Sequence, residues 1–308
     1  MRRGLVIGCG GTVGGAWEVG ALAAVRDALD WDPRTAEVIV GSSSGSSLAA
    51  MLGAGVGVDE LVAGQRGDST ARESVRRFFT SPPARFPRAP LAPPTSPRLA
   101  RAGLRSRSWL VGLSGLAPRG RTDAGFLDRL IDDLAPDGWV AHPRTWIVTL
   151  DAATGERVAF GRPDAPKAAL RDAVRASWAV PGWYPPVTIA GRRYLDGGVG
   201  SPTSADLVAE LALDEVVVIS PMAATDGAAI PGFGGRVEGL LRRSMSRTLA
   251  REVAALRAAG TRVTQIHPTA GELAQMGFNF MDPRRRLAAL DAALTTIPAR
   301  LGDLEVKP

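Results

Sequence analysis

Five serines crowd the segment "GSSSGSS", residues 41–47, and one of them has the setting of a nucleophile. An apolar run at residues 38–40 precedes the segment, and an Ala-rich stretch follows it. Residues 41–45 fit G-x-S-x-G, in which a sharp turn between a strand and a helix holds the central serine in a strained conformation with its hydroxyl exposed. The pattern predicts Ser43 as the nucleophile. The alternative is an ordinary helix start with Ser42 or Ser43 as its N-cap.

A glycine-rich turn, "GCGGTVGG" at residues 8–15, is the second candidate element of a site. A dinucleotide site needs G-x-G-x-x-G, but Val13 occupies the position of the last glycine. A P-loop needs a terminal Gly-Lys-Ser/Thr, which this turn lacks. An oxyanion hole needs only free backbone N–H groups beside the nucleophile. Because the ends of neighbouring parallel strands meet, this turn could lie next to Ser43.

A carboxylate is the third element, because a nucleophilic serine must lose its proton. In "YLDGGVG", residues 194–200, Asp196 ends a short apolar run and precedes two glycines. It could accept the proton directly, or it could belong to an ordinary Asp-Gly hairpin turn. The chain has only two histidines. His142 is typical of a surface turn, whereas His267 could complete a Ser–Asp–His triad, so both mechanisms remain open.

Alternating strands and helices must position these residues. The apolar pattern predicts a parallel sheet covered by helices. We expect strands at residues 4–8, 36–41, 145–150, 157–160, 187–189, 193–195, 215–220 and 262–266. We expect helices at residues 16–29, 44–53, 125–134, 167–178, 205–213, 235–259 and 283–301.

The segment 80–121 interrupts this alternation. From Arg76 to Arg121 there are ten Arg, eight Pro and no Asp or Glu. The prolines predict a loop without regular helix or strand, either a lid or a disordered insertion. Because the alternation continues on both sides, we expect a single domain, 1–308, with an insertion at 80–121 and a C-terminal helical segment at 271–308.

The charge of the Arg76–Arg121 segment favours contact with phosphate-bearing surfaces. Interleaved aromatic residues and a recognisable nucleic-acid-binding module are both missing, so we predict an anionic membrane and no nucleic acid as its partner.

Composition sets further limits on the class of protein. The chain has 308 residues, a net charge of +6 and one cysteine, Cys9. A single cysteine excludes an intramolecular disulfide, and the N-terminal apolar run is too short for a signal peptide, so a cytoplasmic, peripherally membrane-associated protein is expected. Two histidines and one cysteine argue against a zinc site, and no cofactor is predicted.

Together the three elements resemble the patatin-like phospholipase family. The resemblance rests on "GLVIGCGGTVGGAWEVGAL", on "IVGSSSGS" and on "DAVRASWAVPGWYPPVTIAGRRYLDGGVGSPTSADLV", and it covers about residues 4–55 and 145–220. It implies a three-layer α/β/α sandwich with a mainly parallel sheet. It also implies a serine hydrolase that acts on lipid esters through an acyl-enzyme, without a cofactor.

The resemblance assigns roles to individual residues. Ser43 becomes the nucleophile and Asp196 the general base, and backbone N–H groups of Gly10, Gly11 and Ser44 form the oxyanion hole. The chain departs from the family pattern in two places: Cys9 replaces a frequent glycine, and Val13 replaces a frequent Arg or Lys. These departures motivate an alternative, a catalytically weak or inactive lipid-binding or regulatory protein. The aromatic residues Trp178, Trp183 and Tyr184 could line an acyl pocket or pack in the core.

Overall fold

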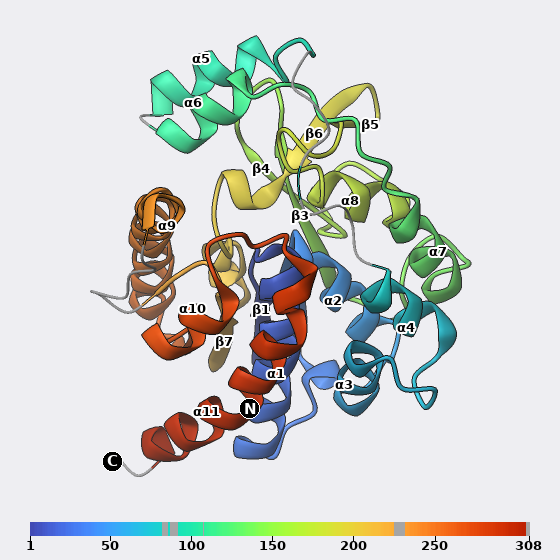
Figure 1. The fold of residues 1–308 in the computed structure, drawn as a ribbon, viewed down its shortest axis with the longest axis vertical. Helices are drawn as coiled ribbons and strands as arrows, with labels where there is room; N and C mark the ends of the chain where they lie inside the picture. Colours follow the sequence, from blue (N-terminus) through green and yellow to red (C-terminus); the bar gives the residue numbers. More distant parts are fainter. Residues whose placement is uncertain (82–85, 87–91, 107, 225–231, 306–308) are drawn as a thin grey trace.

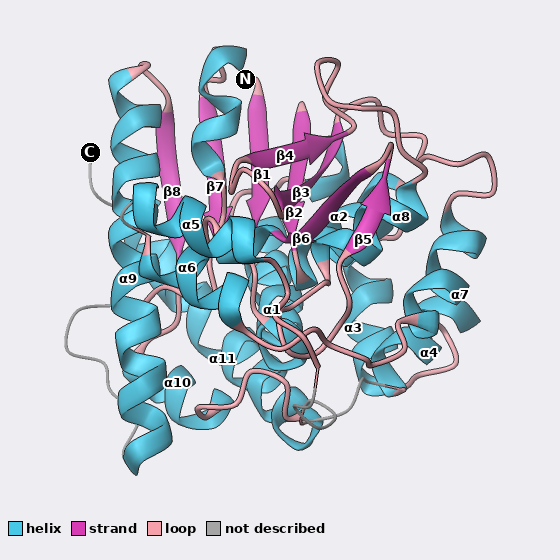
Figure 2. Ribbon diagram, turned by 90° about the horizontal axis from the view of Figure 1, so that it is seen from above, coloured by secondary structure: helices cyan, strands magenta, loops and turns pink. Residues whose placement is uncertain are grey.

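A mixed sheet forms the centre of the molecule. The computed structural model describes residues 1–81, 86, 92–106, 108–224 and 232–305. Within these residues eight strands join one sheet in the order β5-β6-β3-β2-β1-β7-β8, and β4 pairs with β3 beside this path. Figure 2 shows β8, β7, β1 and β2 in sequence across the sheet, with β5 and β6 at the opposite side. The strands are β1 (Arg3–Ile7), β2 (Val38–Ser42), β3 (Thr145–Asp151), β4 (Arg157–Phe160), β5 (Val187–Ile189), β6 (Arg192–Asp196), β7 (Glu215–Ile219) and β8 (Arg262–Ile266).

The pairing directions divide the sheet into two parts. Strands β3, β2, β1, β7 and β8 are parallel to their neighbours in that order, whereas β4, β5 and β6 pair antiparallel. The central strands β1 and β2 are almost continuously apolar and buried, as expected for parallel strands covered on both faces. The mainly parallel sheet agrees with the prediction from the sequence.

Helices cover both faces of the sheet, which gives the three-layer α/β/α sandwich expected from the sequence. Alternate residues of β1 show the two layers: Leu5 and Ile7 pack with α1, α2 and α11, whereas Val6 packs with α9. Figure 1 shows α9 on one side of the molecule, away from α2 and α3. The helices are α1 (Gly11–Ala28), α2 (Ser44–Gly53), α3 (Val58–Arg66), α4 (Glu73–Thr80), α5 (Pro97–Ser106), α6 (Trp109–Leu116), α7 (Gly125–Leu134), α8 (Leu170–Ser177), α9 (Gly232–Ala258), α10 (Ala270–Met276) and α11 (Arg286–Glu305). None of those described has the length and the apolar character to cross a membrane.

The segment 80–121 contains two helices, α5 and α6, so the prediction that its prolines prevent regular structure was wrong. Pro97 occupies the first position of α5, where a backbone N–H has no helical partner to lose. Residues 98–117 contain no proline, and the Ser108 hydroxyl accepts a hydrogen bond from the N–H of Val111 at the start of α6. The segment that was predicted to be a lid or a disordered insertion also includes residues 82–85, 87–91 and 107. These lie outside the described residues.

Other elements differ in detail from the prediction. Residues 205–211 form a 3₁₀ helix between two residues with left-handed backbone, Ser204 and Ala212, and not the expected α-helix. Helices α3 and α4 were not predicted, and α10 was expected only as part of the C-terminal helical segment 271–308. By contrast α2, α7, β4, β5 and β8 have the predicted bounds. The division into one domain with an insertion and a C-terminal segment remains a prediction.

Candidate active site

Ser43 occupies the turn between β2 and α2 and has a strained backbone, with φ 54° and ψ −121°. Close packing around the turn explains its small neighbours. A Cβ at Gly41 would lie 2.2 Å from the carbonyl oxygen of Gly45, and a Cβ at Gly45 would lie 2.3 Å from that of Ile7. The Ser43 hydroxyl makes no N-cap hydrogen bond to α2. The geometry therefore agrees with a nucleophile elbow and contradicts the simple N-cap alternative for Ser43.

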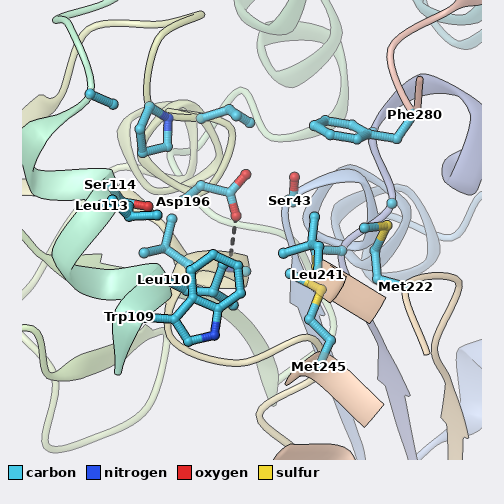
Figure 3. Close-up of a pocket in the computed structure, with 18 residues that line it drawn as sticks. Ser43, Trp109, Leu110, Leu113, Ser114, Asp196, Met222, Leu241, Met245 and Phe280 are labelled. Carbon is cyan, nitrogen blue, oxygen red and sulfur yellow. Dashed lines mark hydrogen bonds between the residues drawn. The ribbon is translucent and has the colours of Figure 1, made fainter. Parts of the chain in front are cut away.

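Asp196 is the last residue of β6, and strand register brings it close to Ser43. Ser42 pairs with Val148 of β3, and Asp196 pairs with the next residue, Thr149. The two strand ends are so close that a Cβ at Gly197 would lie 2.7 Å from the Ser42 hydroxyl oxygen. Figure 3 shows the Asp196 carboxyl group facing the Ser43 hydroxyl across the pocket.

The environment of Asp196 makes it a base near neutral pH. The residue is only 4% exposed, and one carboxyl oxygen accepts a hydrogen bond of 2.7 Å from the N–H of Gly198. Burial raises the pKa of Asp196 to about 7, although hydrogen bonds from Ser43 and Gly198 oppose the rise by stabilising the carboxylate. A carboxyl group with this pKa can both accept and return a proton at physiological pH.

The glycine-rich turn between β1 and α1 lies beside Ser43. Gly10 and Gly11 line the same cavity as Ser43 and Asp196. No side chain fits at either glycine: a Cβ at Gly10 would lie 2.6 Å from Pro221 Cγ, and one at Gly11, where φ is +60°, would lie 2.6 Å from Phe280 Cδ2.

Backbone donors for an oxyanion are available at this turn and at α2. The N–H groups of Gly10 and Gly11 donate to no acceptor among the described residues, whereas that of Val13 donates to the Phe280 carbonyl. Ser44 is the first residue of α2, where a helix leaves its N–H groups without helical partners. Its side chain lines a smaller adjoining cavity and not that of Ser43, but its N–H directly follows Ser43 along the chain.

The cavity at Ser43 has a volume of about 300 Å³ and a mainly apolar lining. Its walls come from distant parts of the chain: α6, the end of β6, the loop after β7, α9 and the segment before α11. Figure 3 shows these side chains around Ser43 and Asp196. The apolar residues of the lining include Leu110, Leu113, Val180, Val199, Met222, Leu241, Met245 and Phe280. Such a cavity suits a hydrocarbon chain better than a polar ligand.

Two buried polar residues that the sequence analysis missed hold the elbow in place. The Ser177 hydroxyl accepts a 2.8 Å hydrogen bond from the Ser43 N–H and donates one of 2.7 Å to the Val148 carbonyl. The Ser44 hydroxyl donates to a carboxyl oxygen of Glu18 on α1, at 3.0 Å. Burial raises the pKa of Glu18 well above its usual value, whereas the hydrogen bond from the Ser44 hydroxyl opposes this rise. Glu18 is an acidic residue within a largely apolar stretch of helix α1, and this unusual position was the signal that could have identified it as a functional residue.

The two departures from the family pattern leave the backbone donors intact. Cys9 packs against the Asp-Gly-Gly turn, since a Cβ at Gly198 would lie 2.8 Å from its sulfur. Burial, together with the nearby Asp196 and Glu18 carboxyl groups, raises the pKa of the Cys9 thiol, so it stays neutral. The Val13 side chain, near the start of α1, is buried in the main hydrophobic core. Neither residue competes with Ser43 as a nucleophile.

Neither histidine lies at the cavity. His267 follows β8, which is three strands away from β2 in the sheet, or about 14 Å at the usual strand spacing. Its burial and the neighbouring Arg300 lower the pKa of its ring. His142 contacts the Ala36 carbonyl, before the start of β2 and therefore at the far end of that strand from Ser43. The structure thus brings together Ser43 and Asp196 but not the third member of a Ser–Asp–His triad.

The aromatic residues near the site belong to the core. Trp178 donates a hydrogen bond to the Ser47 hydroxyl and packs edge-on against Phe78 and Phe126. Neither Trp183 nor Tyr184 is among the residues that line the cavity, and both pack with the main core. The core alternative therefore holds for Trp183 and Tyr184, whereas Trp178 packs in the core and also lines the smaller cavity beside Ser44. No cluster of three or more His, Cys, Asp or Glu side chains in the described ranges could hold a metal ion.

Comparison with known proteins shows that one family model matches most of the chain. A family model described as Patatin-like phospholipase matches residues 5–209, a range that includes Gly10, Ser43 and Asp196. Among solved structures, the chain is similar to VipD from Legionella pneumophila, with a TM-score of 0.45 and 15% identity over 98% of this chain and 67% of that one. None of the curated proteins matches the chain.

Proposed function

The chain belongs to the patatin-like phospholipase family, and from this we propose that it is a serine lipid acyl hydrolase, a carboxylic ester hydrolase that uses a Ser43–Asp196 dyad. Membership of the family indicates a lipid hydrolase in general. The observation that carries the finer proposal is the meeting of a strained serine and a carboxyl group of pKa about 7 at one apolar cavity.

Acylation begins with attack of the Ser43 hydroxyl oxygen on the ester carbonyl, while Asp196 accepts the hydroxyl proton. The tetrahedral oxyanion lies against the N–H groups of Gly10, Gly11 and Ser44, which supply fixed dipoles where negative charge develops. Collapse of this intermediate breaks the bond to the alcohol, and Asp196 returns the proton to that oxygen. The acyl group remains on Ser43 as an ester.

Deacylation repeats these steps with water as the nucleophile. The Asp196 carboxylate accepts a proton from water, and the hydroxide oxygen attacks the acyl carbonyl. The second tetrahedral intermediate releases the fatty acid, and Ser43 recovers its proton. Each cycle consumes one ester and one water and gives one acid and one alcohol. The apolar walls, among them Leu110, Met222 and Met245, hold the acyl chain throughout.

We expect turnover of a soluble ester to require ionised Asp196. Because the pKa of this residue is about 7, kcat/KM should fall about tenfold for each pH unit below 7 and reach a plateau above it. The measurement is a pH profile of kcat/KM with a short-chain aryl ester between about pH 5 and 9, with circular dichroism at each end as a control for unfolding. An acid limb near the ordinary aspartate pKa of about 4 would contradict the assignment.

Covalent labelling separates a hydrolase from the regulatory alternative. A fluorophosphonate probe should react with Ser43 and no other serine, as located by peptide mass spectrometry. The same protein should hydrolyse at least one member of a panel of phospholipid, lysophospholipid, triacylglycerol and short-chain esters. A folded protein that forms no Ser43 adduct and hydrolyses none of these would instead be a lipid-binding protein that has the fold without the turnover.

A further inference from the structure

Helix α6 exposes a stripe of large apolar side chains. Trp109, Leu113 and Leu116 follow one another at helical spacing of four and three residues, and their exposed fractions are 49%, 56% and 60%. Figure 1 shows α6 beside α5 at the outer edge of the molecule. Exposed apolar side chains clustered in this way mark interaction sites more often than scattered ones do.

A second exposed stripe on α9 continues the first. Arg236, Leu240, Arg243 and Arg247 recur at spacings of four, three and four residues, and each is exposed. The two stripes meet in a surface groove lined by Trp109, Leu240, Arg243, Ser244 and Arg247. We refer to the α6 and α9 stripes together as the rim.

The rim borders the cavity that holds Ser43, since α6 and α9 both contribute residues to its lining. Trp109 and Leu113 line this cavity although both are about half exposed, so they form the boundary between cavity and solvent. Leu241, next to Leu240 on α9, lines the opposite wall. Any ligand that enters from this side must pass the rim.

The charge around the rim has one sign. Residues 92–121 and 232–251 contain no acidic residue except Glu238, which is buried and paired with Arg242. None of the exposed arginines there has an acidic partner within the described part of the chain. They are Arg98, Arg101, Arg105, Arg119, Arg121, Arg236, Arg243, Arg247 and Arg251.

We propose that the rim docks onto the surface of an anionic lipid bilayer, so that the cavity entrance faces the acyl chains. Tryptophan and leucine would enter the interfacial region while the arginines contact headgroup phosphates. A protein partner seated on the rim would close the entrance, whereas a bilayer supplies the substrate through it. The proposal rests on the proposed function for the direction of substrate entry, but docking itself needs no turnover.

Binding to vesicles in the Ser43→Ala background tests docking without lipid breakdown. We expect flotation with vesicles that contain about a third phosphatidylglycerol and little with pure phosphatidylcholine. The double variant Arg243→Gln/Arg247→Gln should bind about 25-fold more weakly, because each arginine near the membrane surface contributes about fivefold to the affinity. Leu116→Gln/Leu240→Gln should lower binding about tenfold or more, because two apolar contacts with the interface are lost. None of these four residues forms the wall of the Ser43 cavity.

Matched controls change the same residue types elsewhere on the surface. Arg193→Gln/Arg257→Gln removes two exposed arginines on β6 and at the end of α9, and Leu287→Gln alters an exposed leucine on α11. Both should bind vesicles as the Ser43→Ala protein does. Equal losses in the rim and control variants would overturn the proposal, since net charge alone would then explain binding. Stronger binding to duplex DNA than to vesicles, with the same arginine dependence, would also overturn it.

Failure of the proposed function gives a different result. With Ser43 present, the rim variants should hydrolyse a soluble short-chain ester at the unaltered rate but vesicle phospholipid more slowly. Vesicle binding that depends on the rim, in a protein that hydrolyses no ester, would leave docking in place and refute only the hydrolase. Hydrolysis of vesicle lipid at equal rates by all variants would refute only docking.

Discussion

Replacement of Ser43 by alanine is expected to lower kcat/KM for ester hydrolysis by at least about 10⁴-fold, because Ser43 is the cavity-lining hydroxyl that hydrogen bonds to Asp196. Cys9 is the nearest alternative, but its thiol is buried and neutral. The substitution leaves the backbone hydrogen bond from residue 43 to Ser177 in place, so the turn retains its shape. Steady-state kinetics with a soluble ester measure the loss, and thermal unfolding verifies the fold.

Ser114 offers a matched control, since its hydroxyl belongs to α6 and lines the same cavity. Ser114→Ala should change kcat/KM by no more than about twofold. A comparable loss in both variants would show that hydroxyl groups matter for the polarity of the cavity and not for chemistry. Residual activity of Ser43→Ala near that of the unaltered protein would remove Ser43 from the mechanism altogether.

Replacement of Asp196 by asparagine should cost about 10³-fold or more in kcat/KM while raising stability above neutral pH. Asparagine has nearly the same shape, and its amide oxygen can still accept the hydrogen bond from Gly198. It cannot accept the proton of Ser43. Kinetics at pH 8 measure this loss, and His267→Ala in parallel should retain most activity.

The expected gain in stability follows from the raised pKa of Asp196. Between about pH 4 and 7 the folded protein keeps a proton that the unfolded chain releases, so stability from this group is present at low pH and is lost as the pH rises through about 7. Asparagine removes this dependence. The free energy of unfolding at pH 8 should rise by on the order of a few kcal/mol. Loss of activity accompanied by a lower melting temperature would indicate a structural defect, and strong loss in His267→Ala alone would restore the triad.

Local sequence predicted the catalytic candidates because each lies at a strand end with a short-range signature. The G-x-S-x-G pattern at Ser43 and the Asp-Gly-Gly pattern at Asp196 both depend on small residues where backbones approach closely, as at Gly45 and Gly197. Their meeting depends on β6 pairing with β3, about 45 residues away along the chain. The pairing itself was not predicted, since no pattern within either strand specifies its partner, and the family resemblance supplied only the assignment of the two residues to one site.

The cavity and its entrance could not be predicted in the same way. Leu110 and Met245 face one cavity from helices more than 100 residues apart along the chain, and each helix has apolar residues on more than one side. The prolines around α5 and α6 also concealed both helices. Ser177 was missed because a buried hydroxyl that binds a backbone N–H has no signature beyond being a serine.

The packing of α11 against α1 has a consequence for how the chain reaches its native state. These two helices form an extensive contact, and Gly20 of α1 lies so close to Ala293 of α11 that a Cβ there would be 2.6 Å from the alanine methyl. A nascent chain therefore cannot bury the outer side of α1 until α11, more than 250 residues further along the chain, has left the ribosome. Such long-range contacts slow folding and prolong exposure of apolar surface. The residues that carry Ser43 are thus synthesised before α11, and α1 beside them becomes fully covered only after α11 has been made.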